Sequence, residues 1–240
     1  MAAHFARRTL VHNTLQALRL PHKLIDFAAT LPEKRRSRFL TARSLLAELM
    51  LRIYGIAELP ELTISSYGRP HFVDRHLPDF SIAYAGTVVG VLLAEEGGRA
   101  GLGMEIVRAH SRQVMDRYLR DLSSGEKAWI NAQLDPSEAA IQLWAMRKSL
   151  LKLTGRAPDP GDLLHLHPAS GRFRANGFPD IQAVSNVEPL LLWSCAFSSG
   201  SERLHLWEYD EDENWVQLQN ILVNKVNIGQ HVLRLTSRSF

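Results

Sequence analysis

The segment from Asp135 to Gly155 constrains the fold most, because its sequence marks both ends of one long helix. Asp135 is a favourable N-cap residue, Pro136 suits the first helical turn, and Glu138 completes a capping-box pattern. Gly155 stands where a helix usually ends. The apolar residues that recur at helical spacing are Ala139, Leu143, Met146, Leu150 and Leu153. This pattern predicts an amphipathic helix with one stripe buried against a core.

Two lysines, Lys148 and Lys152, stand one turn apart on the opposite side of this helix. At i, i+4 spacing, like charges repel each other by about 0.2–0.5 kcal/mol on an isolated helix. An anion held between the two ammonium groups would reverse that repulsion. The spacing alone leaves two interpretations open: a solvated polar face, which is the usual case, and an anion-binding face.

Composition bounds the class of protein. The chain has 240 residues, of which 45% are hydrophobic, so it can bury the core of one large domain or two small ones. No run of about eighteen apolar residues occurs, so we expect no membrane span. The N-terminus has no apolar stretch, so we expect no secretory signal. The net charge of +3 suits an anionic ligand or an acidic partner.

The single cysteine, Cys195, lies in an apolar run and is expected to be a buried strand residue rather than a nucleophile. One cysteine excludes a disulfide within the chain, which is typical of a reducing compartment. We therefore expect a cytoplasmic location.

A second helix is predicted to open at a capping box from Thr30 to Glu33, to run to about Tyr54 and to be closed by Gly55. Its first half carries the basic residues Lys34, Arg35, Arg36, Arg38 and Arg43. Arg36 and Arg43 lie two turns apart on one side and could bind one phosphate-bearing ligand. A solvated basic face and a nucleic-acid patch are the alternatives.

Strand patterns occupy much of the remaining chain, whereas residues 1–29 show no clear pattern. The predicted strands are Phe80–Gly86, Thr87–Ala94, Leu102–Val107, Leu163–Leu166, Leu190–Phe197, Leu204–Tyr209 and Trp215–Leu218. Gly68-Arg69-Pro70 predicts a turn before the first of them. Pro158 and Pro160 predict a break after the long helix. Helices followed by strands occur twice, so the sequence predicts an α+β protein.

Five segments, in this order, resemble the signature motifs of the 4′-phosphopantetheinyl transferases. They are Arg38–Leu46 (family pattern R-R-F-L-x-x-R-x-L-L), Gly68–Pro70 (G-K/R-P), Phe80–Gly86 with Leu102–Val107 (F-N/S-I/L-S-H-S/T-G, then G-V/I/C-D-I/V-E), Asp121–Glu126 (F-S/T-x-x-E) and Trp144–Lys152 (W-x-x-K-E-A/S-x-x-K). The resemblance covers about Thr30 to Gly155 and extends more weakly to about Phe197.

This resemblance implies the fold of that family, in which two similar α+β halves pack face to face in one chain. The halves would be 1–112 and 113–240, the second with a C-terminal extension, because residues 216–240 have no counterpart. It implies transfer of the 4′-phosphopantetheine arm of coenzyme A to a serine of an acyl or peptidyl carrier protein. We expect the protein to work as a monomer, with no membrane or nucleic-acid partner.

The resemblance also implies a set of site residues. Coenzyme A would be held by Arg36, Arg43, Arg69, Pro70, Ala83, Tyr84, Arg147 and Lys152. Catalytic roles would belong to Glu105, Lys148 and Lys152. In the family, the arginine at the position of Arg43 helps to hold the 3′-phosphate, and the G-K/R-P turn lies beside the adenine.

The chain departs from the family where that family holds Mg²⁺ with three carboxylates. Glu105 stands at the first of these positions, Val107 at the second and Lys148 at the third. A phosphate-binding Ser-His pair has become Ala83 and Tyr84. A single carboxylate is expected to hold Mg²⁺ only weakly.

These departures leave three interpretations open. The first is an active but divergent transferase, in which Lys148 contacts the diphosphate in place of the metal. Glu105 would then pair with Lys148 or accept the serine proton. The second is a degenerate relative that binds coenzyme A or a carrier protein without transfer. The third, a nucleic-acid-binding protein, is not favoured, because the basic helix lacks interleaved aromatic residues and the chain has no zinc-finger spacing.

Overall fold

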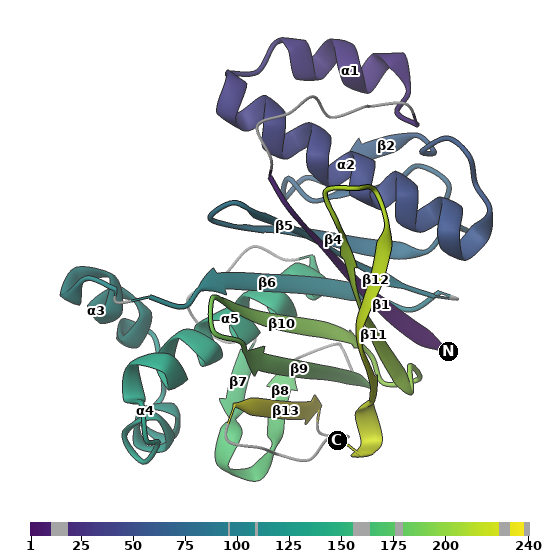
Figure 1. The fold of residues 1–240 in the computed structure, drawn as a ribbon. Helices are drawn as coiled ribbons and strands as arrows, with labels where there is room; N and C mark the ends of the chain where they lie inside the picture. The colour runs from purple at the N-terminus through teal and green to yellow at the C-terminus, as the bar shows by residue number, and fades with distance from the viewer. Residues whose placement is uncertain are drawn as a thin grey trace.

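The structure is a computed structural model that describes residues 1–10, 19–95, 97–108, 110–155, 164–175, 180–225 and 231–237. It has a mixed α and β architecture with two large sheets, which confirms the coarse fold class (Figure 1). The break predicted at Pro158 and Pro160 lies outside the described residues. No described helix is both long and apolar enough to cross a membrane.

The first sheet has five strands in the order β12-β11-β1-β5-β4. Their bounds are β1 Ala2–Thr9, β4 Asp79–Ala85, β5 Val88–Ala94, β11 Arg203–Tyr209 and β12 Trp215–Leu222. β1 lies in the middle, parallel to β11 and antiparallel to β5. Its residues 3–6 are all buried, so its apolar side chains do not alternate with polar ones. This is why residues 1–29 showed no strand pattern in the sequence.

The second sheet has six strands in the order β6-β10-β9-β13-β8-β7, and a small third sheet pairs β2 with β3. The bounds are β2 Leu62–Ile64, β3 Pro70–Phe72, β6 Ala100–Ile106, β7 Leu164–His167, β8 Arg172–Ala175, β9 Ile181–Val187, β10 Leu191–Ser198 and β13 Val232–Ser237. The strands predicted from the sequence are present within one to four residues at their described ends. β2, β3, β8, β9 and β13 were not predicted.

Each large sheet is covered on one face by a long helix (Figure 1). α2 (Glu33–Tyr54) covers the first sheet and α5 (Pro136–Thr154) covers the second. The other faces of the two sheets pack on each other around Phe5 and Trp193. The resulting layers are helix, sheet, sheet and helix. The shorter helices are α1 His22–Ala29, α3 Arg112–Arg120 and α4 Ser124–Asn131, with 3₁₀ turns at Pro168–Ser170 and Val223–Lys225.

Strand pairing crosses the expected boundary after residue 112. β6 precedes this boundary but pairs with β10 in the second sheet. β11 and β12 follow it but belong to the first sheet, beside β1. The division into halves 1–112 and 113–240 stays a prediction, and under it each half would contribute strands to the other's sheet.

The N-cap and the C-terminal end of α5 are confirmed, but the predicted capping box is not formed, because the Glu138 carboxylate does not bond back to Asp135. The Asp135 carboxylate accepts a hydrogen bond from the Glu138 amide at 3.0 Å, and Gly155 ends the helix with φ of 63°. This left-handed conformation favours glycine. The Glu138 carboxylate contacts His231 at 3.0 Å.

The prediction for the start of α2 was wrong in its cap. The Thr30 hydroxyl donates to the Phe27 carbonyl at the end of α1, and Pro32 is the N-cap of α2 without a side-chain bond. The Thr30 hydroxyl therefore bonds to the C-terminal end of α1 and does not cap the N-terminus of α2. At the start of α4, by contrast, Ser123 and Glu126 exchange both hydrogen bonds of a capping box.

Gly101 and Gly103 let α5 approach β6 closely. A Cβ atom on Gly101 would clash with the Ser149 carbonyl of α5, and one on Gly103 would clash with the Ala145 carbonyl. The backbone of α5 thus lies almost directly on β6. This contact fixes the distance and rotation of α5 relative to the sheet.

We predict that Gly103→Ala destabilises the protein, because the added methyl group must push α5 away from β6. Overpacking of this kind costs about 1–3 kcal/mol, and each kcal/mol lowers the Tm of a protein of this size by about 2–4 °C. Thermal unfolding followed by circular dichroism measures the loss. Gly125→Ala in α4 is the matched control, because nothing but the Ser123 hydroxyl lies within 4 Å of its Cβ position. Equal Tm values for the two variants would contradict the close packing.

Candidate functional site

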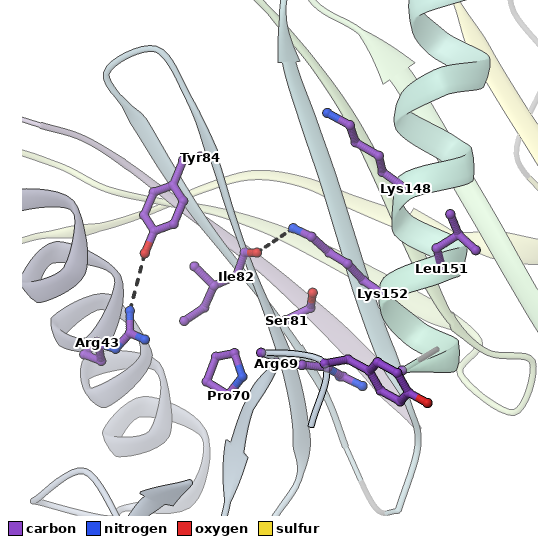
Figure 2. A pocket seen from close by; sticks show the side chains of 12 residues that line it. Arg43, Arg69, Pro70, Ser81, Ile82, Tyr84, Lys148, Leu151 and Lys152 are labelled. Carbon is purple, nitrogen blue, oxygen red and sulfur yellow. Dashed lines mark hydrogen bonds between the residues drawn. The ribbon is translucent and has the colours of Figure 1, made fainter. Parts of the chain in front are cut away.

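A cavity of about 520 Å³ lies between α2 and α5, beside β4 and the turn that precedes β3 (Figure 2). It is lined by Arg43, Tyr67, Gly68, Arg69, Pro70, Ser81, Ile82, Tyr84, Lys148, Leu151, Lys152 and Gly155. Figure 2 shows Arg43 of α2 on one side and Lys148 and Lys152 of α5 on the other. Four lining side chains are cationic, and no described residue of the lining carries a carboxylate. The cavity is therefore built to receive an anion.

Lys152 is the most strongly perturbed cation of the cavity. Its ammonium donates to the Ile82 carbonyl of β4 at 2.7 Å, and no ion pair joins it to a described carboxylate. Burial is the main cause that lowers its pKa to about 8, and the positive charges of Lys148 and Arg69 lower it further. A half-buried ammonium without a carboxylate partner is destabilising unless a ligand supplies the counter-charge.

Lys148 lies one turn before Lys152 and forms an ion pair with Glu105 at the end of β6. The distance from the Lys148 ammonium to the Glu105 carboxylate is 2.5 Å. The ammonium also lies 5.8 Å from the centre of the Trp144 ring. Of the two roles that the sequence left open for Glu105, the structure shows the pairing with Lys148.

Arg43 forms the opposite wall, together with Tyr84. Its guanidinium lies 3.7 Å from the centre of the Phe39 ring and donates a long bond of 3.4 Å to the Tyr84 hydroxyl. Its Nε is buried without a hydrogen-bond partner among the described residues. Burial lowers the pKa of Arg43, whereas the Tyr84 hydroxyl raises it. Because a guanidinium stays charged at physiological pH, Arg43 keeps unused donors beside the cavity.

Arg69 and Pro70 reach the cavity from the turn before β3, but the Arg69 side chain is already bonded. One of its terminal nitrogens lies 2.8 Å from the Asp79 carboxylate and 2.8 Å from the carbonyls of Phe80 and Ala100. Arg69 therefore ties the turn to β4 and β6 while adding positive charge to the cavity.

Three of the predicted coenzyme A residues do not line this cavity. The Arg36 guanidinium donates to the carbonyls that end α1, those of Ala28, Ala29 and Leu31. The Arg147 guanidinium forms an ion pair with the buried Glu126 at 2.7 Å and turns toward α4 and β7. Ala83 is buried between the two sheets, because its neighbour Tyr84 takes the cavity side of β4.

Two polar residues of β4 were missed in the sequence. The Asp79 carboxylate binds Arg69 and also accepts from the Ala100 amide, and the Ser81 hydroxyl accepts from the Leu102 amide at 3.0 Å. Both connect β4 to β6 under the cavity. The presence of polar residues in an otherwise apolar strand was the sequence signal that could have identified them.

The cavity does not fit a divalent metal ion. Glu105 is the carboxylate nearest to the lysine pair, and its oxygen is bonded to an ammonium group. Among the described residues, no three His, Cys, Asp or Glu side chains come together as a metal site would need. Mg²⁺ prefers several oxygen ligands, so the part of the chain described here offers it no cage.

We predict that pyrophosphate binding weakens between pH 7 and pH 9, because Lys152 loses its proton near its pKa of about 8. A bound anion favours the charged form, so the affinity should be high below that pKa and fall above it. Isothermal titration calorimetry at several pH values measures this. Lys152→Arg keeps its charge and should flatten the profile. An unchanged pH profile in that variant would exclude Lys152 as a contact of the anion.

Comparison with known proteins gives one extensive and several partial similarities. No protein-family model matches the chain. The chain is 27% identical over 147 residues to the 4′-phosphopantetheinyl transferase AcpT of Escherichia coli (strain K12), with 60% of this chain and 69% of AcpT covered. It is 28% identical over 148 residues to AcpT of Salmonella typhimurium (strain LT2), covering 60% and 70%. This similarity is distant and partial.

The extensive similarity is to the uncharacterized protein YieE of Escherichia coli (strain K12), which is 42% identical over 245 residues. The match covers 100% of this chain and 97% of YieE. The chain therefore belongs to the same family as YieE.

Proposed function

We propose that this protein transfers the 4′-phosphopantetheine arm of coenzyme A to a serine of an acyl or peptidyl carrier protein. The observation that carries the proposal is a cavity with cations on two facing walls and no described carboxylate in its lining. These cations lie in the segments that resemble the transferase motifs. The partial similarity to AcpT supports the same reading.

The arrangement of cations suits the two anionic centres of coenzyme A. The 3′-phosphate is separated from the 5′-diphosphate by the ribose, and the cavity likewise has Arg43 on one wall and two lysines on the other. We assign the 3′-phosphate to Arg43 and the diphosphate to Lys148 and Lys152. The exposed ring of Tyr67 and the Pro70 ring, both in the lining, offer flat apolar surfaces for the adenine.

The transfer joins the serine Oγ to the phosphorus that carries the pantetheine arm. The bond from that phosphorus to the bridging oxygen breaks, and 3′,5′-adenosine bisphosphate leaves. Positive charge placed on the diphosphate before reaction stabilises the negative charge that builds up as this bond breaks. Lys148 and Lys152 supply this charge. We assign the serine proton to Glu105, the carboxylate beside these lysines.

Binding without transfer is the second candidate function. The observation that favours it is the Glu105–Lys148 ion pair. Glu105 is the only one of the three metal-binding carboxylates of the transferases that this chain keeps, and the ion pair occupies it. In this reading the cavity still holds coenzyme A, but no serine is modified.

A nucleic-acid function has less support, because three basic residues of α2 are bonded within the protein or face the cavity. Arg36 donates to backbone carbonyls, Arg38 donates to the Gly86 carbonyl at 2.7 Å, and Arg43 faces the cavity. Phosphate recognition by a nucleic-acid patch needs several free cations along one surface.

The transfer itself is tested by intact mass spectrometry of candidate apo-carrier proteins after incubation with this protein and coenzyme A. We expect a mass gain of one phosphopantetheine arm. A carrier protein with its acceptor serine changed to alanine is the control. Coenzyme A binding without any mass gain, with or without Mg²⁺, would favour the second candidate function.

Arg43→Ala should weaken coenzyme A by about tenfold or more, because a hydrogen bond to a charged group is worth about 1.5–3 kcal/mol. The affinity for dephospho-coenzyme A, which lacks the 3′-phosphate, should change much less. Arg36→Ala is a matched control from the same helix, because Arg36 lies outside the cavity. Calorimetry measures the affinity of the unmodified protein and of each variant for both ligands. Equal losses for both ligands would exclude Arg43 as the 3′-phosphate contact.

A further inference from the structure

The misfit between the cavity and a metal ion points to a different way of neutralising the ligand. We propose that the Lys148 ammonium replaces the metal ion at the diphosphate, and that Glu105 holds this ammonium in place until the ligand exchanges for it. The inference rests on the proposed function for the identity of the ligand as coenzyme A. It adds that binding needs no divalent cation and that Glu105 competes with the ligand.

The geometry of the ion pair permits this exchange. The Lys148 side chain is 42% exposed and lines the cavity, whereas the Glu105 side chain is 16% exposed and lies behind it at the end of β6. Figure 2 shows the Lys148 side chain extending from α5 above that of Lys152. An incoming anion therefore meets the ammonium before it meets the carboxylate.

The balance of charge favours the ligand over Glu105. A diphosphate carries more negative charge than one carboxylate, and it also contacts Lys152, which has no described carboxylate partner. The positive charges of Lys148 and Arg69 help to lower the pKa of Lys152, and the Glu105 carboxylate offsets only part of that shift. One ligand that contacts two of these cations relieves more repulsion than Glu105 relieves alone.

The apolar surroundings of position 107 also disfavour the carboxylate that is missing there. Val107 packs in an apolar cluster with Tyr118, Ile141 and Trp144. Trp144 in turn stacks on Tyr118, with ring centres 4.7 Å apart. A second carboxylate at position 107 would lose solvation there, so this region suits an ammonium with one carboxylate partner.

The exchange and a metal site predict opposite changes in anion affinity when Glu105 is replaced by Gln. If Glu105 competes with the ligand for Lys148, then Glu105→Gln frees the ammonium and tightens anion binding. If Glu105 ligates a metal ion that bridges the diphosphate, then the same substitution weakens binding. The amide is nearly the same size as the carboxylate, so the packing around position 105 is kept.

The experiment is calorimetry of coenzyme A and of inorganic pyrophosphate, each in the presence of a chelator and again in Mg²⁺. We expect both ligands to bind in chelator, and Glu105→Gln to tighten both by roughly 1.5-fold to fivefold, the range for a partly exposed ion pair. Lys148→Ala should weaken both by about tenfold or more. The double variant should recover part of this loss, because the unpaired carboxylate is removed with the ammonium.

Lys127→Ala is the matched control, because Lys127 is an exposed lysine on the neighbouring helix α4 and does not line the cavity. It should leave both affinities unchanged. Circular dichroism melting shows that each variant is folded, and Glu105→Gln in chelator decides the question alone if Lys148→Ala does not fold.

Four outcomes separate this inference from the proposed function. Tighter binding by Glu105→Gln in chelator, together with weaker binding by Lys148→Ala, supports the exchange. Binding that requires Mg²⁺ and is lost in Glu105→Gln overturns it and leaves the proposed function standing. Pyrophosphate binding with the expected pattern but no binding of coenzyme A supports the exchange and overturns the proposed function. Chelator-resistant binding that Lys148→Ala does not change overturns the exchange.

Discussion

The close approach of α5 to β6 sets the geometry on which the cavity depends. The two glycines of β6 allow the α5 backbone to rest on the strand, and a side chain at either position would lift the helix. One stripe of α5 is then buried at Leu143, Met146 and Leu150, and the lysine face turns toward the edge of the sheet. With the helix in this rotation, Lys148 meets Glu105 at the end of β6 and Lys152 meets the Ile82 carbonyl on β4. The same contact between α5 and β6 therefore determines both the packing of the core and the positions of the cations.

The second constraint is the free energy of holding cations in a partly desolvated cavity. Lys152 has its pKa lowered to about 8, mainly by burial, and Arg43 keeps a buried Nε without a partner in the described chain. Below pH 8 the Lys152 ammonium is charged in the folded protein and destabilises it relative to the unfolded chain, where its pKa is higher. Such groups persist in folded proteins mainly where a ligand offsets their cost, so their position argues for an anion even before the ligand is named.

Much of the architecture could be predicted from local signals, and the failures have physical reasons. The C-terminal ends of α2 and α5 could be predicted, because Gly55 and Gly155 end helices in a conformation that other residues avoid. The apolar stripe of α5 could be predicted from its helical spacing. β1 was not readable, because a central strand buried on both faces has no alternation. The layer order was not readable either, because strand exchange between distant segments leaves no mark in local periodicity.

The cationic residues near the site could be predicted from the sequence, but the partner that each of them binds could not. Arg36 and Arg43 share one side of α2 by spacing, yet the carbonyls at the end of α1 take the Arg36 guanidinium. Arg147 follows the motif but is bound by Glu126. No pattern in the sequence states which neighbour a flexible arginine will find. Ala83 was a different case, since strand alternation already places it on the side opposite to Tyr84.

Val107 and Lys148, the two positions that lack the metal-binding carboxylates of the 4′-phosphopantetheinyl transferases, are best understood together. Independent losses of carboxylates would leave unpaired charge or unfilled space in several places. Here Lys148 is paired with Glu105, Val107 packs in an apolar cluster beside Tyr118, and the Trp144 ring of that cluster has its centre 5.8 Å from the Lys148 ammonium. Each substitution fits the environment that the others create. A lysine without the remaining glutamate would add one more unpaired cation beside Lys152, and a glutamate at position 107 would lie among apolar side chains. The consistency of these residues argues that the region is adapted to an ammonium group rather than left over from a metal site.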